Sequence, residues 1–475
     1  MGISPGFAID ATLVWASTVD GVTAAVSIIT ALEGETTSIT PLPAPSLSKE
    51  KAARLRIYCS SKEHQHAIRS GLSQNPHLRI VTWQDTVHDH HKAGKIALHV
   101  KNPPMSTEDL SIAYTPGVAR ICKTIAADKS QSFAYTQRAN AVCVLSDGTA
   151  ILGLGNLGPE AAMPVMEGKA LLFKTFADVD AYPLCVRVNS TEELIAVGKA
   201  IAPTYGGINL EDIAAPRCFE VEERLQELVD IPVFHDDQHG TAIVVLAALI
   251  NGLTIVGKKM ENLRIAVAGV GAAGTAVTKL LLSAGVKCII GADRAGILYR
   301  GRGEMNSSKE KYAEMTNPDN EKGSLADSLR GADVFIGLSG PNIITAEDVK
   351  QMNSKAMIFA LSNPDPEIAP AEAMCYAEIV ATGRSDFPNQ INNVLAFPGV
   401  FRGALDCRAS RITEGMKRAA AEAIAGLVSS EELSKEKIVP AALDKRVAFA
   451  VAEAVKNAAE AEGVARGIVD PTPLA

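Results

Sequence analysis

Paired cysteines, a basic surplus and long apolar segments are all missing from this chain. Its eight cysteines are scattered singly with no Cys-x-x-Cys pair, a pattern typical of reduced thiols in a cytoplasmic protein and not of disulfides or zinc sites. The first Lys or Arg is Lys49, so we expect neither a signal nor a transit peptide. The longest apolar stretch, 243–256, is interrupted by Asn251 and Gly252, which predicts no membrane span. The net charge of −8 excludes a general nucleic-acid or anionic-membrane binder.

The remaining composition is that of an α/β protein with several domains. The chain has 475 residues, of which 47% are hydrophobic and 21% charged, enough for about two to four packed cores. The N-terminal part alternates strands and helices in the order βαββαβ, at 7–15, 21–32, 36–40, 54–59, 62–73 and 78–83. This pattern predicts a ferredoxin-like α+β module. The module resembles ACT-type regulatory domains, which bind small effectors and pair with themselves. A dimerisation module without a ligand remains an equal alternative.

Two acidic stretches follow short apolar runs that we interpret as buried strands. Glu211 and Asp212 end the first run, and Asp236 and Asp237 end the second. If the two strands are neighbours, Glu211, Asp212 and one acid of the second pair converge in one crevice. Three carboxylates suit Mg²⁺ or Mn²⁺, which leave positions open for a chelating substrate. The alternative, that each acid only caps a helix, is weakened because acids recur at matching strand ends.

A glycine-rich turn follows the predicted strand 263–268. It reads Gly269-Val270-Gly271-Ala272-Ala273-Gly274, and it is followed by a predicted helix at 275–283, a strand at 286–292 and Asp293. This order predicts a Rossmann domain, in which a G-x-G-x-x-G turn lies between a strand and a helix and an acid follows the next strand. The turn of such a domain receives the pyrophosphate of a dinucleotide. Further strands at 332–338 and 356–361 continue the rhythm.

An earlier glycine set has the same spacing. Gly153, Gly155 and Gly158 precede Asp178 and Asp180, but prolines crowd this copy and no uninterrupted strand-turn-helix-strand unit surrounds it. We therefore assign the nucleotide to the later turn and interpret the earlier one as a glycine-rich wall near the cofactor.

The acid after the second Rossmann strand bears on cofactor choice. Asp293 favours NAD, since a carboxylate binds ribose hydroxyls and repels a 2′-phosphate. Arg294, Arg300 and Arg302 follow closely, and a guanidinium can receive that phosphate. The sequence therefore predicts NAD and leaves NADP open.

Two further positions have competing interpretations. Lys169 begins an apolar helix, where it can extend its amine to water or, buried beside a metal, serve as a base. Asn392 and Asn393 lie where the chain leaves the nucleotide domain, either as turn residues or as substrate contacts. Helices predicted at 413–427 and 442–462 are expected to pack back on the domain that carries the acids.

Over about residues 86–430, these ordered motifs resemble the malic enzyme family in its shorter bacterial form. The resemblance rests on six motifs: Ala-Tyr-Thr-Pro-Gly-Val, Glu-Gly-Lys, Asn-Leu-Glu-Asp-Ile, His-Asp-Asp-Gln-His-Gly-Thr, Ser-Asn-Pro and Asn-Asn-Val. It implies roles for seven of their residues: Tyr114 as general acid, Lys169 as general base, Glu211, Asp212 and Asp237 as metal ligands, and Asn363 and Asn393 as contacts of the substrate or the nicotinamide. Larger relatives carry a substrate-binding arginine where this chain has Ala150, so another group must take that role.

The resemblance also implies an activity. It is the metal-dependent oxidative decarboxylation of (S)-malate to pyruvate and CO₂, with reduction of NAD or NADP, by a cytoplasmic homodimer or higher homo-oligomer. A malolactic-type enzyme that retains its cofactor and a catalytically silent nucleotide sensor are the alternatives. We expect an ACT-like regulatory domain at 1–85, a catalytic domain at 86–252, a Rossmann domain at 253–395 and C-terminal helices at 396–475.

Overall fold

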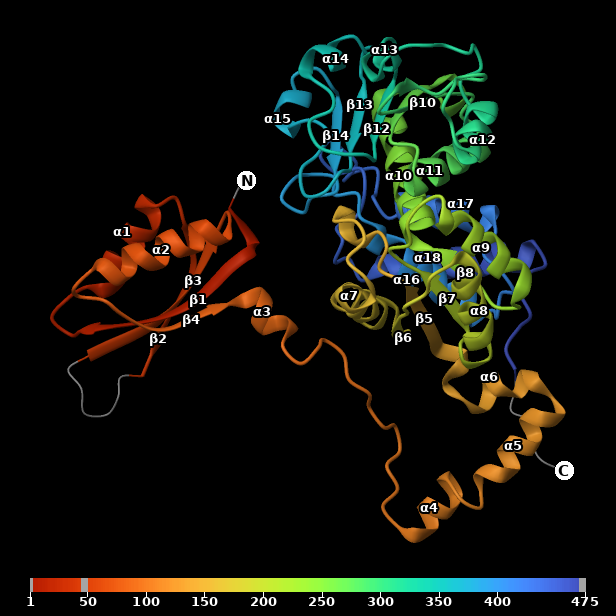
Figure 1. The fold of residues 1–475 in the computed structure, drawn as a ribbon, viewed down its shortest axis with the longest axis horizontal. Coiled ribbons are helices and arrows are strands. Elements are labelled where there is room, and N and C mark those ends of the chain that lie inside the picture. Colours follow the sequence, from red (N-terminus) through yellow and green to blue (C-terminus); the bar gives the residue numbers. More distant parts are fainter. Residues whose placement is uncertain (1–2, 44–49, 470–475) are drawn as a thin grey trace. The chain divides into compact units, whose positions relative to one another are not determined.

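The structure is a computed structural model that describes residues 3–43 and 50–469. The chain forms two compact units, Met1–Leu98 and His99–Ala475, which are described separately. In Figure 1 the first unit is red to orange, and the second contains two sheets with their covering helices.

The first unit confirms the βαββαβ prediction. Its sheet is antiparallel in the order β2-β3-β1-β4, the ferredoxin-like arrangement. Alternate residues of the central strands, such as Ile9, Leu13, Leu55 and Ile57, are buried in one core, as the period of a half-buried strand requires. The elements are β1 (Ser4–Ala16), α1 (Gly21–Ala31), β2 (Glu35–Leu42), β3 (Glu50–Cys59), α2 (Lys62–Gln74), β4 (Arg79–Asp85) and α3 (Thr86–His91).

The second unit begins with three short helices and a four-stranded parallel sheet. The strand order is β6-β5-β7-β8, and its strands are almost continuously apolar because helices cover both faces. Helix α7 packs against β5 and β6, and α9 against β8. The elements are α4 (Thr107–Ala113), α5 (Val118–Ala127), α6 (Ser132–Tyr135), β5 (Ala141–Ser146), α7 (Pro159–Ala177), β6 (Asp180–Cys185), α8 (Thr191–Ile201), β7 (Gly207–Leu210), α9 (Arg217–Leu228) and β8 (Val233–His235).

The second sheet confirms the predicted Rossmann domain. Its order is β11-β10-β9-β12-β13-β14, with only β11 antiparallel to its neighbour. Strand β10 lies on one side of β9 and β12 on the other, so the strand order switches sides at β9. Nucleotides bind at this switch point in such sheets. The elements are β9 (Arg264–Ala268), α11 (Ala272–Ser283), β10 (Cys288–Asp293), β11 (Gly296–Ile297), α12 (Ser307–Met315), α13 (Leu325–Leu329), β12 (Val334–Gly337), α14 (Ala346–Lys350), β13 (Met357–Ala360), α15 (Pro370–Ala373) and β14 (Ile379–Thr382).

A long helix, α10 (Asp236–Val256), connects the two sheets. By length and composition alone it could cross a membrane, but most of it is buried within the protein, as befits a core helix. The apolar pattern of the sequence predicts a helix from Thr241 to Leu253. Its predicted start is wrong, because the helix begins five residues earlier and includes the acids in its first turn. The three C-terminal helices pack on α7 and α10 and so return to the first sheet. They are α16 (Phe397–Asp406), α17 (Glu414–Gly426) and α18 (Arg446–Ala461).

Candidate active site

The two acidic stretches lie side by side. Strands β7 and β8 are parallel neighbours with Leu210 opposite His235, so the residues that follow them emerge at the same sheet edge. The backbone N–H of Asp212 donates a hydrogen bond of 2.9 Å to Asp237 Oδ2. The sequence-based expectation that these acids meet is therefore confirmed.

Lys169 of α7 reaches into this acidic cluster. Its Nζ lies 2.6 Å from Asp236 Oδ2 and 2.9 Å from Glu211 Oε1. The amine also lies 4.3 Å from the centre of the Phe397 ring, and the residue is only 7% exposed. The interpretation that this lysine extends to water is wrong, because two carboxylates hold its amine inside the protein.

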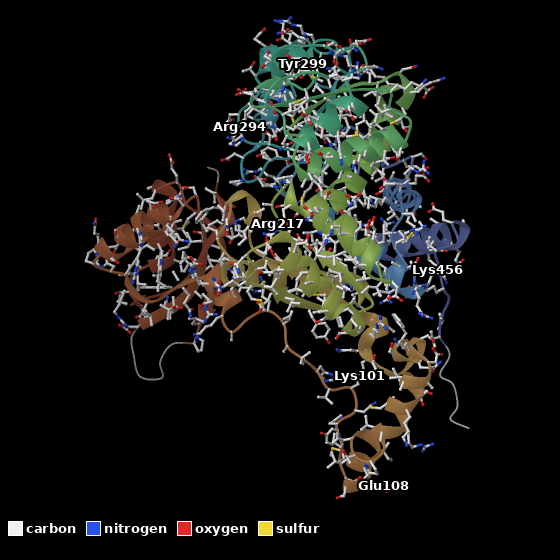
Figure 2. All side chains as sticks on the ribbon, turned by 45° about the vertical axis from the view of Figure 1, so that its right-hand side comes forward. Lys101, Glu108, Arg217, Arg294, Tyr299 and Lys456 are labelled. Carbon is white, nitrogen blue, oxygen red and sulfur yellow. The ribbon has the colours of Figure 1, made fainter. Side chains whose placement is uncertain are left out.

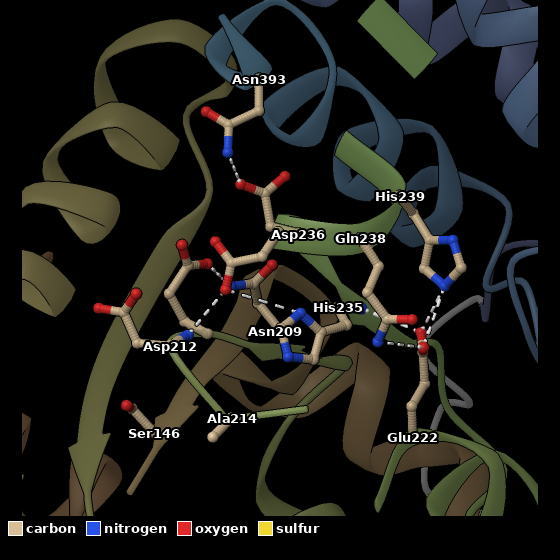
Figure 3. A network of polar contacts seen from close by, with 12 residues as sticks. Ser146, Asn209, Asp212, Ala214, Glu222, His235, Asp236, Gln238, His239 and Asn393 are labelled. Atoms are coloured by element: carbon tan, nitrogen blue, oxygen red, sulfur yellow. Dashed lines mark hydrogen bonds and ion pairs between the residues drawn. The ribbon is translucent and has the colours of Figure 1, made fainter. Parts of the chain in front are cut away.

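Asparagines orient the two carboxylates from the other side. Asn209 Nδ2 donates to Glu211 Oε2 at 2.8 Å, and Asn393 Nδ2 donates to Asp236 Oδ2 (Figure 3). Asn393 is 157 positions away in the chain, and the fold brings it to the site as predicted. Gly240 is required here, since a Cβ at that position would lie 2.0 Å from Asp236 Oδ1.

The cluster has more negative than positive charge. Four acids, Glu211, Asp212, Asp236 and Asp237, surround the single Lys169 amine. Burial raises the pKa of Glu211 well above its usual range, although Lys169 opposes the shift. Burial and repulsion from Asp237 raise the pKa of Asp212 to about 7. For Lys169, the carboxylates of Asp236 and Glu211 outweigh burial, which would lower the pKa, and hold it above its ordinary value.

Unpartnered atoms complete this pattern of a site that is suited to a cation. Asp212 Oδ2, Asp236 Oδ1, Asn209 Oδ1 and both ring nitrogens of His235 are buried without a hydrogen-bond partner. Buried oxygens without donors are costly, and a divalent cation would satisfy them. Within residues 3–43 and 50–469, however, no group of three or more His, Cys, Asp or Glu side chains is arranged to hold a metal ion as the structure stands. The oxygen atoms suit a hard cation, but the side chains are not arranged as a complete set of metal ligands.

Glu222 of α9 fixes the start of α10. One of its oxygens accepts the His235 N–H at 3.0 Å, and the other accepts Gln238 Nε2 at 3.2 Å and His239 Nε2 at 3.0 Å (Figure 3). Lys417 of α17 lies 3.0 Å from His239 Nδ1. The sequence does not predict a role for Glu222, because a single glutamate on an amphipathic helix gives no signal of burial. Nor does the sequence identify Asp236 as the partner of Lys169.

Two predicted residues are not joined to the cluster. Tyr114 follows α4 and is 67% exposed, on a segment that Figure 1 shows outside the sheets. Asn363 is exposed in the loop after β13. Among the described residues, no hydrogen bond or ion pair connects either side chain to Lys169 or the acids. At Ala150 the backbone N–H donates to Asp212 O, and no substitute for the arginine is evident.

The later glycine turn lines a large cavity of about 1310 Å³. Gly269 adopts φ +92°, and a Cβ there would lie 2.5 Å from Leu338 O, so only glycine fits. A Cβ on Gly271 would meet nothing within 4 Å, which leaves space for a phosphate at the N-terminus of α11. Ala272 and Ala273 open that helix, and Gly274 lies so close to Gly269 that a Cβ would overlap its carbonyl.

The cavity extends from the second sheet to the first. Its lining includes Asp293 at the end of β10, Ala215 and Pro216 from the β7–α9 loop, and Phe219 from the first turn of α9. The two loop residues follow the acidic pair Glu211 and Asp212 by only a few positions. A ligand in the cavity therefore reaches from the glycine turn to the loop that carries the acids.

Comparisons with known proteins give a consistent result. The chain matches the family models described as "Malic enzyme, N-terminal domain" over residues 94–226 and "Malic enzyme, NAD binding domain" over residues 238–460. It is 56% identical over 389 residues to an NAD-dependent malic enzyme of Geobacillus stearothermophilus, covering 82% of this chain and 81% of that protein. It is 54% identical over 384 residues to a bifunctional malic/malolactic enzyme of Bacillus subtilis (strain 168), covering 80% and 94%.

A solved structure agrees with these relatives. The crystal structure of malic enzyme from Pyrococcus horikoshii Ot3 superposes with a TM-score of 0.78 at 48% identity, covering 81% of this chain and 92% of that one. Residues 1–93 lie outside both matched family ranges. Two family models that together span most of the chain, and relatives above 50% identity, agree with the glycine turn and the acidic cluster, and we conclude that the chain belongs to the malic enzyme family.

Proposed function

We propose that this protein catalyses the metal-dependent oxidative decarboxylation of (S)-malate to pyruvate and CO₂, with reduction of NAD or NADP. The observation that carries the proposal is the buried Lys169, held between Asp236 and Glu211, together with a cavity that reaches from a dinucleotide-type glycine turn to the loop that follows Glu211 and Asp212. A base, an acidic cluster and a nucleotide site are the groups that hydride removal from a hydroxy acid requires.

Glu211, Asp212 and Asp237 are the ligands we assign to Mg²⁺ or Mn²⁺. We assign Asp236 to the support of Lys169, because its Oδ2 accepts hydrogen bonds from both Lys169 and Asn393. The Asp237 side chain is 36% exposed, and its Oδ2 accepts the Asp212 N–H. Asp237 can therefore turn toward a cation at small cost. Once bound, the cation would act as a Lewis acid on the malate oxygens.

The chain's own residues handle the protons. The neighbouring carboxylates hold the pKa of Lys169 above its ordinary value, and a divalent cation among them would offset their charge and favour the neutral amine. Neutral Lys169 then takes the proton from the C2 hydroxyl as the C2 hydride leaves for the nicotinamide. After CO₂ has left, Tyr114 donates a proton to C3, which requires the α4–α5 segment to bring it to the cleft. Asn363 and Asn393 position the substrate and the nicotinamide, and the Asn393 amide is already fixed on Asp236.

A single assay tests this function. Malate, Mn²⁺ and NAD or NADP should give equal amounts of reduced cofactor and pyruvate. The malolactic alternative has a specific basis, since the Bacillus subtilis relative is named a bifunctional malic/malolactic enzyme. Lactate without reduced cofactor in solution would favour that alternative, and no conversion of malate would favour a nucleotide sensor.

We also propose a homo-oligomer, either a homodimer or a larger assembly. The stretch before α4 and α4 itself expose Val100, Met105 and Ile112, each more than half exposed, and α4 has no buried residue. Such an apolar surface is best explained by a second copy that covers it. Light scattering after size-exclusion chromatography should give at least twice the chain mass, whereas a monomer would contradict the assignment.

The N-terminal module is an ACT-like regulatory domain in this proposal, spanning residues 1–85. It contains a cavity of about 650 Å³ lined by Trp15, Val22, Asp20 and Lys51 among others, which is suited to a small polar effector. We further assign the catalytic domain to 86–252, the Rossmann domain to 253–395 and the helical segment to 396–475. The eight free cysteines support a cytoplasmic location.

A further inference from the structure

Glu367 is a buried carboxylate that no step of the proposed reaction uses. The residue is 0% exposed and lies in the loop between β13 and α15. Within the described part of the chain no cationic side chain pairs with it, and burial raises the pKa of its carboxyl. A buried carboxylate without a cation costs free energy, so filling space is a poor explanation of its presence.

Two backbone N–H groups hold this carboxylate. Its Oε1 accepts the Ser339 N–H at 3.1 Å, and its Oε2 accepts the Ser362 N–H at 3.1 Å. Ser339 follows β12 and Ser362 follows β13, and these strands are parallel neighbours. Gly337, the last residue of β12, leaves the space, because a Cβ there would lie 2.3 Å from Glu367 Cδ. One side chain therefore joins the two loops at the carboxyl end of β12 and β13.

The loop after β12 is part of the wall of the nucleotide cavity, since residues 338–341 line it. Other lining residues follow β10, such as Arg294 and Tyr299, which Figure 2 labels on the part of the ribbon that carries the second sheet. In a sheet of this order the adenosine end of a dinucleotide binds beside the second strand of the fold, which is β10 here. The nicotinamide end therefore extends across β9 toward β12 and β13, where Glu367 joins the loops.

We propose that Glu367 is a positioning residue for the nicotinamide end of the cofactor. Its carboxylate fixes the spacing between the cavity wall at 339–341 and Asn363, which directly follows Ser362. Two equivalent carboxylate oxygens are needed for this, because an amide offers an acceptor to only one of the two loops. The inference rests on the proposed function in placing a dinucleotide in the cavity with its nicotinamide near Asn363.

Glu367→Gln in the full chain tests the proposal without malate or metal. The carboxamide keeps the shape of the side chain but turns an NH₂ group toward one backbone N–H, so one loop loses its acceptor. Isothermal titration of the wild type should show tighter binding of NAD than of ADP-ribose, which lacks the nicotinamide. In Glu367→Gln, NAD should bind at least about tenfold more weakly, whereas the affinity for ADP-ribose should change by less than about threefold. The thermal midpoint should fall by less than about 4 °C, because the substitution also removes a buried charge.

A second variant disturbs the same contact and leaves Glu367 in place. In Gly337→Ala the new methyl group displaces the carboxylate, and NAD should again be weakened more than ADP-ribose. This variant decides the question if Glu367→Gln does not fold. Glu347→Gln is the matched control, because its side chain on α14 is 75% exposed, and it should leave both affinities unchanged.

Three results would overturn the inference. They are a wild type that binds NAD no more tightly than ADP-ribose, a Glu367→Gln variant with unchanged affinity for NAD, and an equal loss of both affinities in Glu367→Gln and Gly337→Ala. The last result would mean that Glu367 only supports the fold. If NAD and ADP-ribose bind as expected but malate is not converted, the proposed function fails and the role of Glu367 in cofactor binding stands.

Discussion

The edge of the first sheet and the end of β10 both contain carboxylates largely shielded from solvent beside cations, but their charge balances are opposite. At the first site four acids surround Lys169, and the pKa values of Glu211 and Asp212 are raised. At the second, two cations hold Asp293, whose pKa is lowered to about 2. The difference indicates which ligand suits each site, a cation at the first and an anion at the second.

Removing the only cation of the first site should have the largest effect. Lys169→Ala is expected to lower turnover of malate by about 10²- to 10⁴-fold while leaving nucleotide binding intact, because the base is lost but the glycine turn is not. Steady-state rates and ADP-ribose titration measure the two effects. Lys174→Ala is the control, since Lys174 lies on the same helix with its side chain 55% exposed. Normal turnover of Lys169→Ala would exclude it as the base.

Neutralising one acid of the first site should weaken its binding of a cation. Asp237→Asn is expected to raise the Mn²⁺ concentration for half-maximal stabilisation by at least about tenfold, because a ligand charge is lost. Thermal unfolding over a Mn²⁺ titration measures this without any substrate. Asp230→Asn, whose side chain is 72% exposed, should behave as the wild type. An unchanged Mn²⁺ response in Asp237→Asn would remove it from the ligand set.

The stabilisation that Glu222 gives to the start of α10 should depend on pH. Burial would raise the pKa of Glu222, but His239 and Lys417 lower it from 4.5 to about 2. The folded-state value lies below the unfolded one, so the stabilisation is complete above pH 4.5 and is lost as the pH falls toward 2. The shift corresponds to roughly 3 kcal/mol, which Glu222→Gln should remove at pH 7.

Urea unfolding at several pH values checks this prediction. The difference between wild type and Glu222→Gln should shrink as the pH falls below about 4.5. Glu220→Gln, with a 55% exposed side chain on the same helix, should change the free energy of unfolding by less than about 0.5 kcal/mol. A constant difference down to acid pH would mean that the Glu222 charge does not stabilise the start of α10.

Local patterns were sufficient to predict much of the fold. Period-two alternation placed the strands of the first unit, and the glycine turn between β9 and α11 identified the Rossmann domain, because both depend on neighbouring residues. The acids at the ends of β7 and β8 were also predicted to meet, since parallel neighbours end at one sheet edge. The start of α10 was misplaced, because polar residues at a helix N-terminus look like a loop.

Long-range partners could not be predicted from such patterns. Nothing local indicates that Lys169 pairs with Asp236 and Glu211, or that Lys309 pairs with Asp293. Tyr114 illustrates the same limit, because its motif gives it a role but not a position, and the described structure leaves it exposed. These outcomes depend on how whole elements pack, which one-dimensional periodicity does not encode.

The most direct test is a titration of Mn²⁺ into chelator-treated protein supplied with malate and NAD, following reduced nicotinamide and pyruvate together. We expect no turnover without metal, saturable restoration by Mn²⁺, and one pyruvate for each reduced cofactor. Full turnover in excess chelator would show that the four acids around Lys169 are not a cation site, which would contradict the account at its centre.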